Sequence, residues 1–212
     1  MDPRFALFTP QEVALVLADP QPGLSFVAQS MDHQTLLSNL VATAKVAGVF
    51  GLPTVVTTSA SSKFSGPWFP ELRAALGGKV DPIERTTLDA FADARVEAAV
   101  RATGRKRLLL AGLLTEACIA FTALHAMEAG YTVHVVVDAC AASSEIAQQT
   151  SLRMLESAGM VPRTWLQVLL ELQRDWTHHE TYAGAVAVVR EHGGNYGIGL
   201  AYAASMLAHA PG

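Results

Sequence analysis

Three side chains that could take part in acyl transfer stand where predicted strands and helices meet loops. Cys118 lies at the start of a helical segment that follows a buried strand, Asp19 directly follows an earlier buried strand, and Arg85 closes a short segment beginning at Val80. A thiol can attack a carbonyl carbon, and a nearby carboxylate can take the thiol proton and return it to a leaving group. A guanidinium beside them would lower the pKa of either acid. These residue types therefore permit a cysteine hydrolase.

The start of a helix is a favourable place for such a thiol. If Thr115 is the N-cap, Cys118 occupies the third helical position, where unpaired N–H groups and the helix dipole stabilise a thiolate. The backbone N–H groups of Leu114 and Cys118 could also receive the negative charge that builds on a carbonyl oxygen under attack. We therefore expect an oxyanion hole in this turn.

Each of these residues also has a purely structural interpretation. A cysteine at an apolar helix start is more often a small core residue, and an aspartate after a strand is more often a turn or cap former. Arg85 could be a surface ion-pair partner, and Cys140, near the end of a later strand, is expected to pack in the core. The residues alone leave these alternatives open.

The elements that must position these side chains alternate between strand and helix. Apolar runs predict strands at 13–18, 53–58, 107–113 and 131–137, with shorter ones at 80–85 and 161–165. Helical spacing and terminal glycines predict helices at 35–48, 69–76, 91–103, 115–129, 146–158 and 166–174. This alternation predicts an α/β fold, a three-layer αβα sandwich around a mostly parallel, doubly covered sheet. In such sheets, ligands bind at the carboxyl ends of the strands, where the three side chains stand.

The composition limits the domain organisation and the partners. The chain has 212 residues, of which 50% are hydrophobic and 16% charged, with a formal net charge of −4. We expect one domain over residues 1–175 and a C-terminal helical extension over 176–212 that packs on the domain or on a neighbouring subunit. The Lys and Arg residues are scattered, which argues against nucleic acid as a partner and favours a small-molecule substrate. Surplus apolar surface suggests a homo-oligomer.

The apolar runs are too short for a membrane span, which needs about twenty residues. The first residues, Met1–Phe5, lack the pattern of a secretory signal, so we expect a cytoplasmic protein with both cysteines reduced.

Two segments carry a resemblance to a known family. Ala14–Gln21, a strand followed by Asp-x-Gln, and Ala111–Cys118, which contains Gly-x-x-Thr-x-x-Cys, resemble segments of the isochorismatase-like cysteine hydrolases. The resemblance covers about residues 10–175, and residues 64–72 and 171–176 are most similar to the YcaC-like branch. It implies the isochorismatase-like, Rossmann-like fold, and its YcaC-like members imply an octamer.

The resemblance also implies roles for individual residues. The family has an Asp, Lys and Cys triad, which makes Asp19 the base and Cys118 the nucleophile. A cis peptide bond is implied between Leu113 and Leu114, and it would aim the Leu114 N–H into the oxyanion hole. The substrate pocket would be walled by residues of the loops at this edge: Gln21, Phe64, Trp68, Phe69 and Thr115.

The third triad position departs from the family pattern. Arg85 stands where the family has lysine; it keeps the positive charge but cannot transfer a proton. Lys63 and Lys79 are less favoured substitutes. Nicotinamidase members carry an Asp-x-His metal cluster after the second strand, whereas this chain has Thr57–Ser61 there, so neither a metal nor another cofactor is expected.

The sequence thus predicts a metal-independent, amidase-like hydrolase that cleaves a C–N bond of a small molecule through a Cys118 thioester, with Asp19 as general base and acid. One alternative is a redox or scavenging protein in which Cys118 is oxidised. Another is a catalytically silent oligomeric member, in line with Arg85 at the lysine position.

Overall fold

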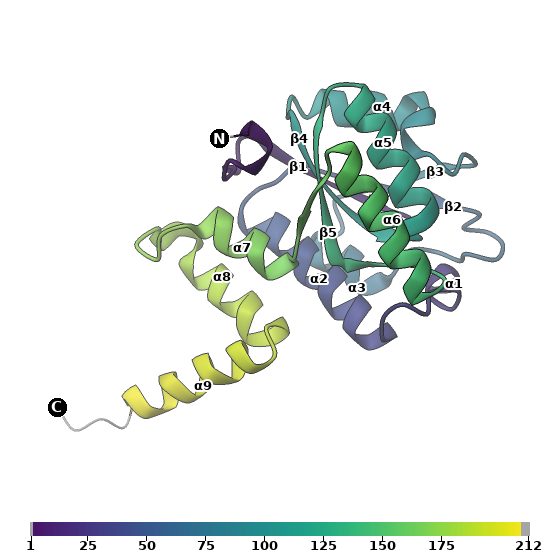
Figure 1. Ribbon diagram of the computed structural model, residues 1–212. Coiled ribbons are helices and arrows are strands. Elements are labelled where there is room, and N and C mark those ends of the chain that lie inside the picture. The colour runs from purple at the N-terminus through teal and green to yellow at the C-terminus, as the bar shows by residue number, and fades with distance from the viewer. Residues whose placement is uncertain (1, 209–212) are drawn as a thin grey trace.

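The computed structural model describes residues 2–208 and contains a sheet of six parallel strands flanked by helices (Figure 1). The strand order is β3-β2-β1-β4-β5-β6. The strands are β1 Val13–Ala18, β2 Thr54–Ser59, β3 Ile83–Arg85, β4 Arg107–Leu113, β5 Thr132–Ala141 and β6 Val161–Arg163. From β1 the chain adds β2 and then β3 on one side of the sheet, and from β4 it adds β5 and then β6 on the other side. The order therefore reverses between β1 and β4, and such a switch point opens a crevice at the carboxyl ends of the two strands.

Helices cover both faces of the sheet and complete the predicted three-layer fold, which is confirmed (Figure 1). On one face lie α2 and α7 with the C-terminal α8 His179–His192, and on the other lie α4, α5 and α6. The α-helices before residue 175 are α1 Pro22–Ser25, α2 His33–Val49, α3 Pro70–Ala75, α4 Ala94–Ala102, α5 Ala120–Glu128, α6 Glu145–Ala158 and α7 Trp165–Gln173. Short helical turns occupy Pro3–Phe5, Ala90–Ala92 and Thr115–Ile119.

The two central strands approach each other unusually closely at the site edge. β1 is buried along its whole length, and Ala18 pairs with Gly112 of β4. Gly112 has a φ of 131°, and a Cβ atom built on it would lie 1.9 Å from the Ala18 carbonyl oxygen. Only glycine fits there. This contact sets the spacing between the carboxyl ends of β1 and β4.

The expected helix at 91–103 is wrong in its first turn. Asp89 accepts a hydrogen bond from the Phe91 amide at 2.9 Å and caps a short turn, and Asp93 accepts one from the Arg95 amide at 2.9 Å and caps α4. Each aspartate accepts a hydrogen bond from an amide that, in one continuous helix, would be bonded to a backbone carbonyl of that helix. The segment therefore forms two capped elements instead of one helix. Strand β5 is also longer than expected, and its pairing with β4 shifts register between Leu110 and Gly112.

Residues after 175 form two further helices, α8 His179–His192 and α9 Asn195–Ala208. Helix α8 packs on α2: Gly184 lies against Val49, and Glu191 forms an ion pair with Lys45 at 2.5 Å. Helix α9 runs away from the body of the molecule (Figure 1). Among the described helices, none combines the length and apolar character needed to cross a bilayer.

Candidate active site

Asp19, Arg85 and Cys118 lie together at the carboxyl edge of the sheet. Asp19 directly follows β1, Arg85 is the last residue of β3, and Cys118 lies in the turn after β4. In the order β3-β2-β1-β4, β1 and β4 are neighbours and β3 is separated from β1 by β2, across which the Arg85 side chain reaches Asp19. Asp19 has a positive φ of 51°, and its amide donates to the Thr57 carbonyl at 3.1 Å. The structure thus brings the three predicted side chains to the switch point of the sheet.

The Asp19 carboxylate is fully buried and accepts three hydrogen bonds. Its Oδ2 accepts from Arg85 Nη2 at 2.6 Å and from the Ser59 hydroxyl at 3.2 Å, and its Oδ1 accepts from the Thr57 hydroxyl at 2.9 Å. A buried carboxylate is tolerated only when it is paired and hydrogen-bonded. These donors hold the carboxylate in one orientation.

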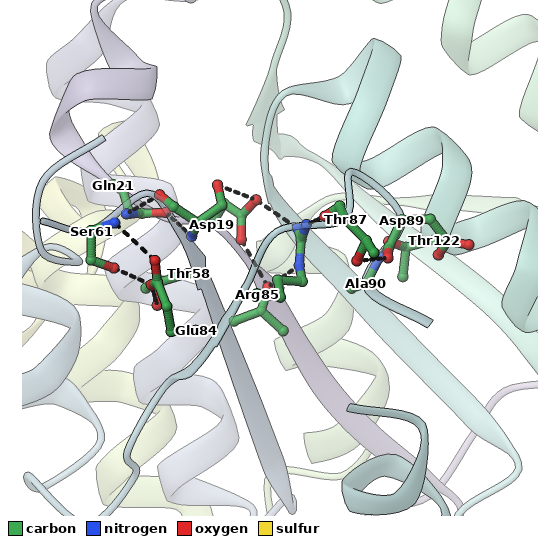
Figure 2. A network of polar contacts seen from close by, with 12 residues as sticks. Asp19, Gln21, Thr58, Ser61, Glu84, Arg85, Thr87, Asp89, Ala90 and Thr122 are labelled. Carbon is green, nitrogen blue, oxygen red and sulfur yellow. Dashed lines mark hydrogen bonds and ion pairs between the residues drawn. The ribbon is translucent and has the colours of Figure 1, made fainter. Parts of the chain in front are cut away.

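Arg85 is a buried part of the site and not a surface ion-pair residue. Its Nε donates to the Thr57 hydroxyl at 3.3 Å, and its Nη1 donates to the Thr87 carbonyl. Figure 2 shows the guanidinium between Asp19 and Thr87. The fixed planar fork explains why arginine suits this place, because a lysine ammonium could not reach all three acceptors at once. Lys63 and Lys79, the alternative cations, lie at exposed positions.

The turn that carries Cys118 differs from the expected helix start. Leu114, not Thr115, is the N-cap, and Thr115–Ile119 form a wide π-helical turn in which Cys118 is the fourth residue. The Leu114 carbonyl accepts hydrogen bonds from the amides of Ala117 and Ile119, both at 3.2 Å. The amide of Cys118, between them in sequence, does not donate to the Leu114 carbonyl. The peptide bond between Leu113 and Leu114 is cis.

Burial and then the Asp19 charge raise the pKa of the Cys118 thiol, and a hydrogen bond with Arg85 lowers it, so that together they bring it to about 11. This direction is opposite to the one expected from a helix start, because the side chain is only 5% exposed and burial is the largest influence on its pKa. Cys118 is therefore a protonated thiol at neutral pH and needs a base to become a nucleophile.

Gln21, which was expected to wall the pocket, is fully buried and its amide braces a loop, while its contact with a substrate stays a prediction. Its Nε2 donates to the carbonyls of Ser59 and Gly66 at 3.0 and 2.6 Å, and its Oε1 accepts from the Ser59 amide at 2.8 Å. Glu84 holds the same loop by accepting from the Ser61 amide at 3.0 Å (Figure 2). Both side chains fix the loop that follows β2.

The remaining expected pocket residues differ in exposure. Phe64 is 67% exposed, Trp68 is buried, and Phe69 is half-buried, with its amide donating to the Pro20 carbonyl at 3.0 Å. Thr115 is fully buried beside Cys118 in the wide turn, and its hydroxyl has no partner among the described residues. Their contact with a substrate stays a prediction.

Cys140 lies fully buried within β5, and burial raises the pKa of its thiol to about 12. Its thiol faces the Leu110 carbonyl at 4.0 Å. These surroundings agree with a core position.

Two hydroxyl residues of the site were not singled out by sequence reasoning. Thr57 and Ser59 were considered only as a segment without metal ligands, yet both donate to Asp19. The sequence feature that could have identified them is their position at the carboxyl end of a predicted strand, β2, which pairs with β1 in the structure. The described part of the chain contains no group of three or more His, Cys, Asp or Glu side chains arranged to hold a metal ion.

Known proteins resemble this chain over most of its length. A model of the isochorismatase domain matches residues 13–167. "Probable hydrolase YcaC" from Escherichia coli (strain K12) is 36% identical over 165 residues, which are 78% of this chain and 79% of that protein.

Solved structures of two YcaC proteins share the fold. The Escherichia coli YcaC gene product, described as an octameric hydrolase of unknown specificity, superposes with a TM-score of 0.90 at 32% identity and covers 95% of this chain and 98% of its own. YcaC from Pseudomonas aeruginosa, solved with hexane-2,5-diol and covalent acrylamide, gives a TM-score of 0.86 at 30% identity, with 91% and 95% covered. With the fold and most of its length matched in this way, the chain belongs to the isochorismatase family and is a hydrolase of that family.

Proposed function

We propose that this chain is a cysteine hydrolase that cleaves a C–N bond of a small amide-like molecule through a thioester on Cys118, without a catalytic metal. The observation that carries the proposal is the buried cluster at the carboxyl edge of the sheet, in which Asp19 is paired with Arg85 at 2.6 Å and both act on the pKa of the buried Cys118 thiol. A protonated thiol beside a fixed carboxylate is a nucleophile with its base in place.

In the first half-reaction, Asp19 takes the thiol proton as the sulfur of Cys118 bonds to the carbonyl carbon. The C=O electron pair moves to the oxygen and then returns as the C–N bond breaks. Asp19 delivers its proton to the leaving nitrogen, which departs as an amine or ammonia. A thioester on Cys118 remains.

In the second half-reaction, water attacks the thioester carbon while Asp19 accepts a water proton. The C–S bond breaks, the acid leaves, and the Cys118 thiol regains its proton from Asp19. Arg85 keeps its charge throughout, so its role is to fix Asp19 and balance the carboxylate charge. Arginine at the family's lysine position is thus compatible with this cycle, because no step requires that position to lose a proton.

The oxyanion of both steps would be received by the backbone amides of Leu114 and Cys118. This assignment is supported by the wide turn, in which the Leu114 carbonyl accepts hydrogen bonds from the amides of Ala117 and Ile119 and not from the amide of Cys118.

The relative from Pseudomonas aeruginosa supports the proposal, since it was solved with covalent acrylamide, a small amide and an electrophile. A reducing compartment such as the cytoplasm suits a chemistry that needs Cys118 as a free thiol, and we propose that location.

The test is intact-mass spectrometry of the chain with acrylamide and with a panel of small amides. We expect a single acrylamide adduct in the wild type and in Cys140→Ala, and none in Cys118→Ala, with amide turnover lost in the same variant. Cys140→Ala is the matched control because both cysteines are buried. Adducts that survive in Cys118→Ala, or turnover independent of Cys118, would refute the proposal.

We also propose that the chain is a homo-oligomer. Support comes from the octameric state of its Escherichia coli relative, which matches 95% of this chain, and from the many large apolar side chains exposed on the single chain.

A further inference from the structure

Helix α9 is apolar on nearly all sides and yet is not buried by its own chain. Asn195–Ala208 contains no charged residue. Ile198, Tyr202 and Met206, spaced four residues apart, form one stripe and are 68%, 65% and 55% exposed. Helices with this composition are normally buried in a core or an interface.

The contact of α9 with the body is confined to its first two turns. Gly197 is buried against α8, where a Cβ atom would lie 2.5 Å from the Val189 carbonyl oxygen, and Leu200 packs against the core. One turn later, Ala204 is exposed on the same side of the helix. The rest of α9 projects away from the other elements (Figure 1).

A membrane surface is a poor match for this helix. Interfacial helices carry Lys and Arg on a polar face, and α9 has neither. Fourteen residues also span only about 21 Å, less than the roughly 30 Å of a bilayer core.

A second copy of the chain is the better match. The octameric Escherichia coli relative aligns with 95% of this chain and 98% of its own, so their lengths agree. The face of α9 combines tyrosines with an open glycine, Gly199, whose built Cβ would meet nothing within 4 Å. Aromatic side chains are enriched in protein interfaces, and a glycine without neighbours lets another backbone approach closely.

We propose that α9 is a docking arm whose Ile198–Tyr202–Met206 stripe packs on a second copy of this chain. The inference makes no use of Cys118 and goes beyond the hydrolase activity, and it rests on the proposed self-association. It assigns residues beyond the family domain, 13–167, to assembly.

The experiment measures the mass of the full-length chain by light scattering over a range of concentrations. The wild type and the control Ile198→Val/Tyr202→Phe should exceed the 22.5 kDa of one chain. Ile198→Glu/Tyr202→Glu should raise the dissociation constant of the assembly at least about thirtyfold, because two charges would enter an apolar contact. Circular dichroism would show that the double-Glu variant remains folded.

A photo-reactive amino acid at position 202 identifies what covers the stripe. We expect a covalent dimer of this chain in purified protein. An oligomer of unchanged mass in the double-Glu variant, with no cross-linked dimer, would overturn the role of α9 while leaving self-association intact. A monomeric wild type would overturn both, and cross-linking only to added phosphatidylcholine vesicles would replace the second copy by a membrane.

Discussion

At the scale of single residues, the site depends on a buried ion pair. Asp19 and Arg85 have no exposed side-chain surface, and their charged atoms lie 2.6 Å apart. A buried pair gives little net stability relative to apolar residues, but removal of one partner leaves a buried charge without compensation. The two residues are therefore coupled, and each should be intolerant of substitution while the other remains.

Substitution of Arg85 tests this coupling. Arg85→Met should lower the free energy of unfolding by about 3–5 kcal/mol, because Asp19 would remain buried without its cation. Arg85→Lys keeps the charge but loses at least one of the bonds to Thr57 and Thr87, so its loss should be smaller, about 1–2 kcal/mol. Urea unfolding of both variants measures the difference, and equal losses would contradict the coupling.

The protonation of Cys118 gives a second prediction. Because burial and the Asp19 charge raise the pKa of the thiol to about 11, its alkylation by iodoacetamide should still be increasing at about pH 10. Asp19→Asn removes one of these causes, so the inflection should move to lower pH although hydrolysis is lost. The rates are measured in a Cys140→Ala background. An unchanged inflection would mean that Asp19 does not act on the thiol.

The sequence singled out Asp19, Arg85 and Cys118 because each stands where a predicted strand or helix meets a loop, and the family resemblance then implied the roles of Asp19 and Cys118. It did not predict Thr57 and Ser59 as partners of Asp19, since hydroxyl residues are common at strand ends. Their role depends on which strands are neighbours and on rotamers, and neither can be seen in a linear pattern.

At the scale of elements, the approach of β1 to β4 depends on Gly112. A Cβ atom there would overlap the Ala18 carbonyl, next to Asp19, so Gly112→Ala should cost about 3 kcal/mol of stability and displace the site. Gly51→Ala is the control: Gly51 also has a positive φ, 64°, but open space around it, so about 1–2 kcal/mol is expected. Thermal unfolding and acrylamide labelling of both variants would show whether the overlap matters.

A buried histidine in β5 should make the sheet sensitive to acid. Burial, followed by the charges of Arg163 and Arg107, lowers the pKa of His134 from 6.5 to about 3. A depressed pKa means that the neutral form stabilises the fold above pH 6.5, and that this stability is lost as the pH falls toward 3.

His134→Leu should therefore remove up to roughly 4–5 kcal/mol of pH-dependent stability across that window. Urea unfolding at a series of pH values measures it, with His179→Leu at the exposed start of α8 as the control. A wild-type slope that persists in His134→Leu would assign the acid sensitivity to the carboxylates.

The order and type of the elements could be predicted from the sequence, since apolar runs and terminal glycines mark them, as Gly159 does for α6. Two of the boundaries that failed have a common cause. The wide turn at Cys118 and the two caps at Asp89 and Asp93 are decided by hydrogen bonds of individual groups, which a hydrophobic pattern does not record.

At the scale of the whole molecule, self-association through α9 should appear in the stability of the chain. Binding that favours the folded state makes the unfolding temperature depend on protein concentration. The wild type should unfold at a higher temperature as it is concentrated, and Ile198→Glu/Tyr202→Glu should show a weaker dependence. Calorimetry over a hundredfold range of concentration measures the effect, and identical slopes would contradict the role of α9.

The candidate site draws one or more groups from each of the four strands β3, β2, β1 and β4, with Asp19 and Cys118 almost a hundred residues apart in the chain. Parallel strands pair only after long loops close, which makes such contacts late and slow to form. No fragment that ends before the first turn beyond β4 can contain the whole cluster. Amide turnover by Cys118 would thus report the assembly of these four strands, and in a growing chain it would begin only after they have found their order.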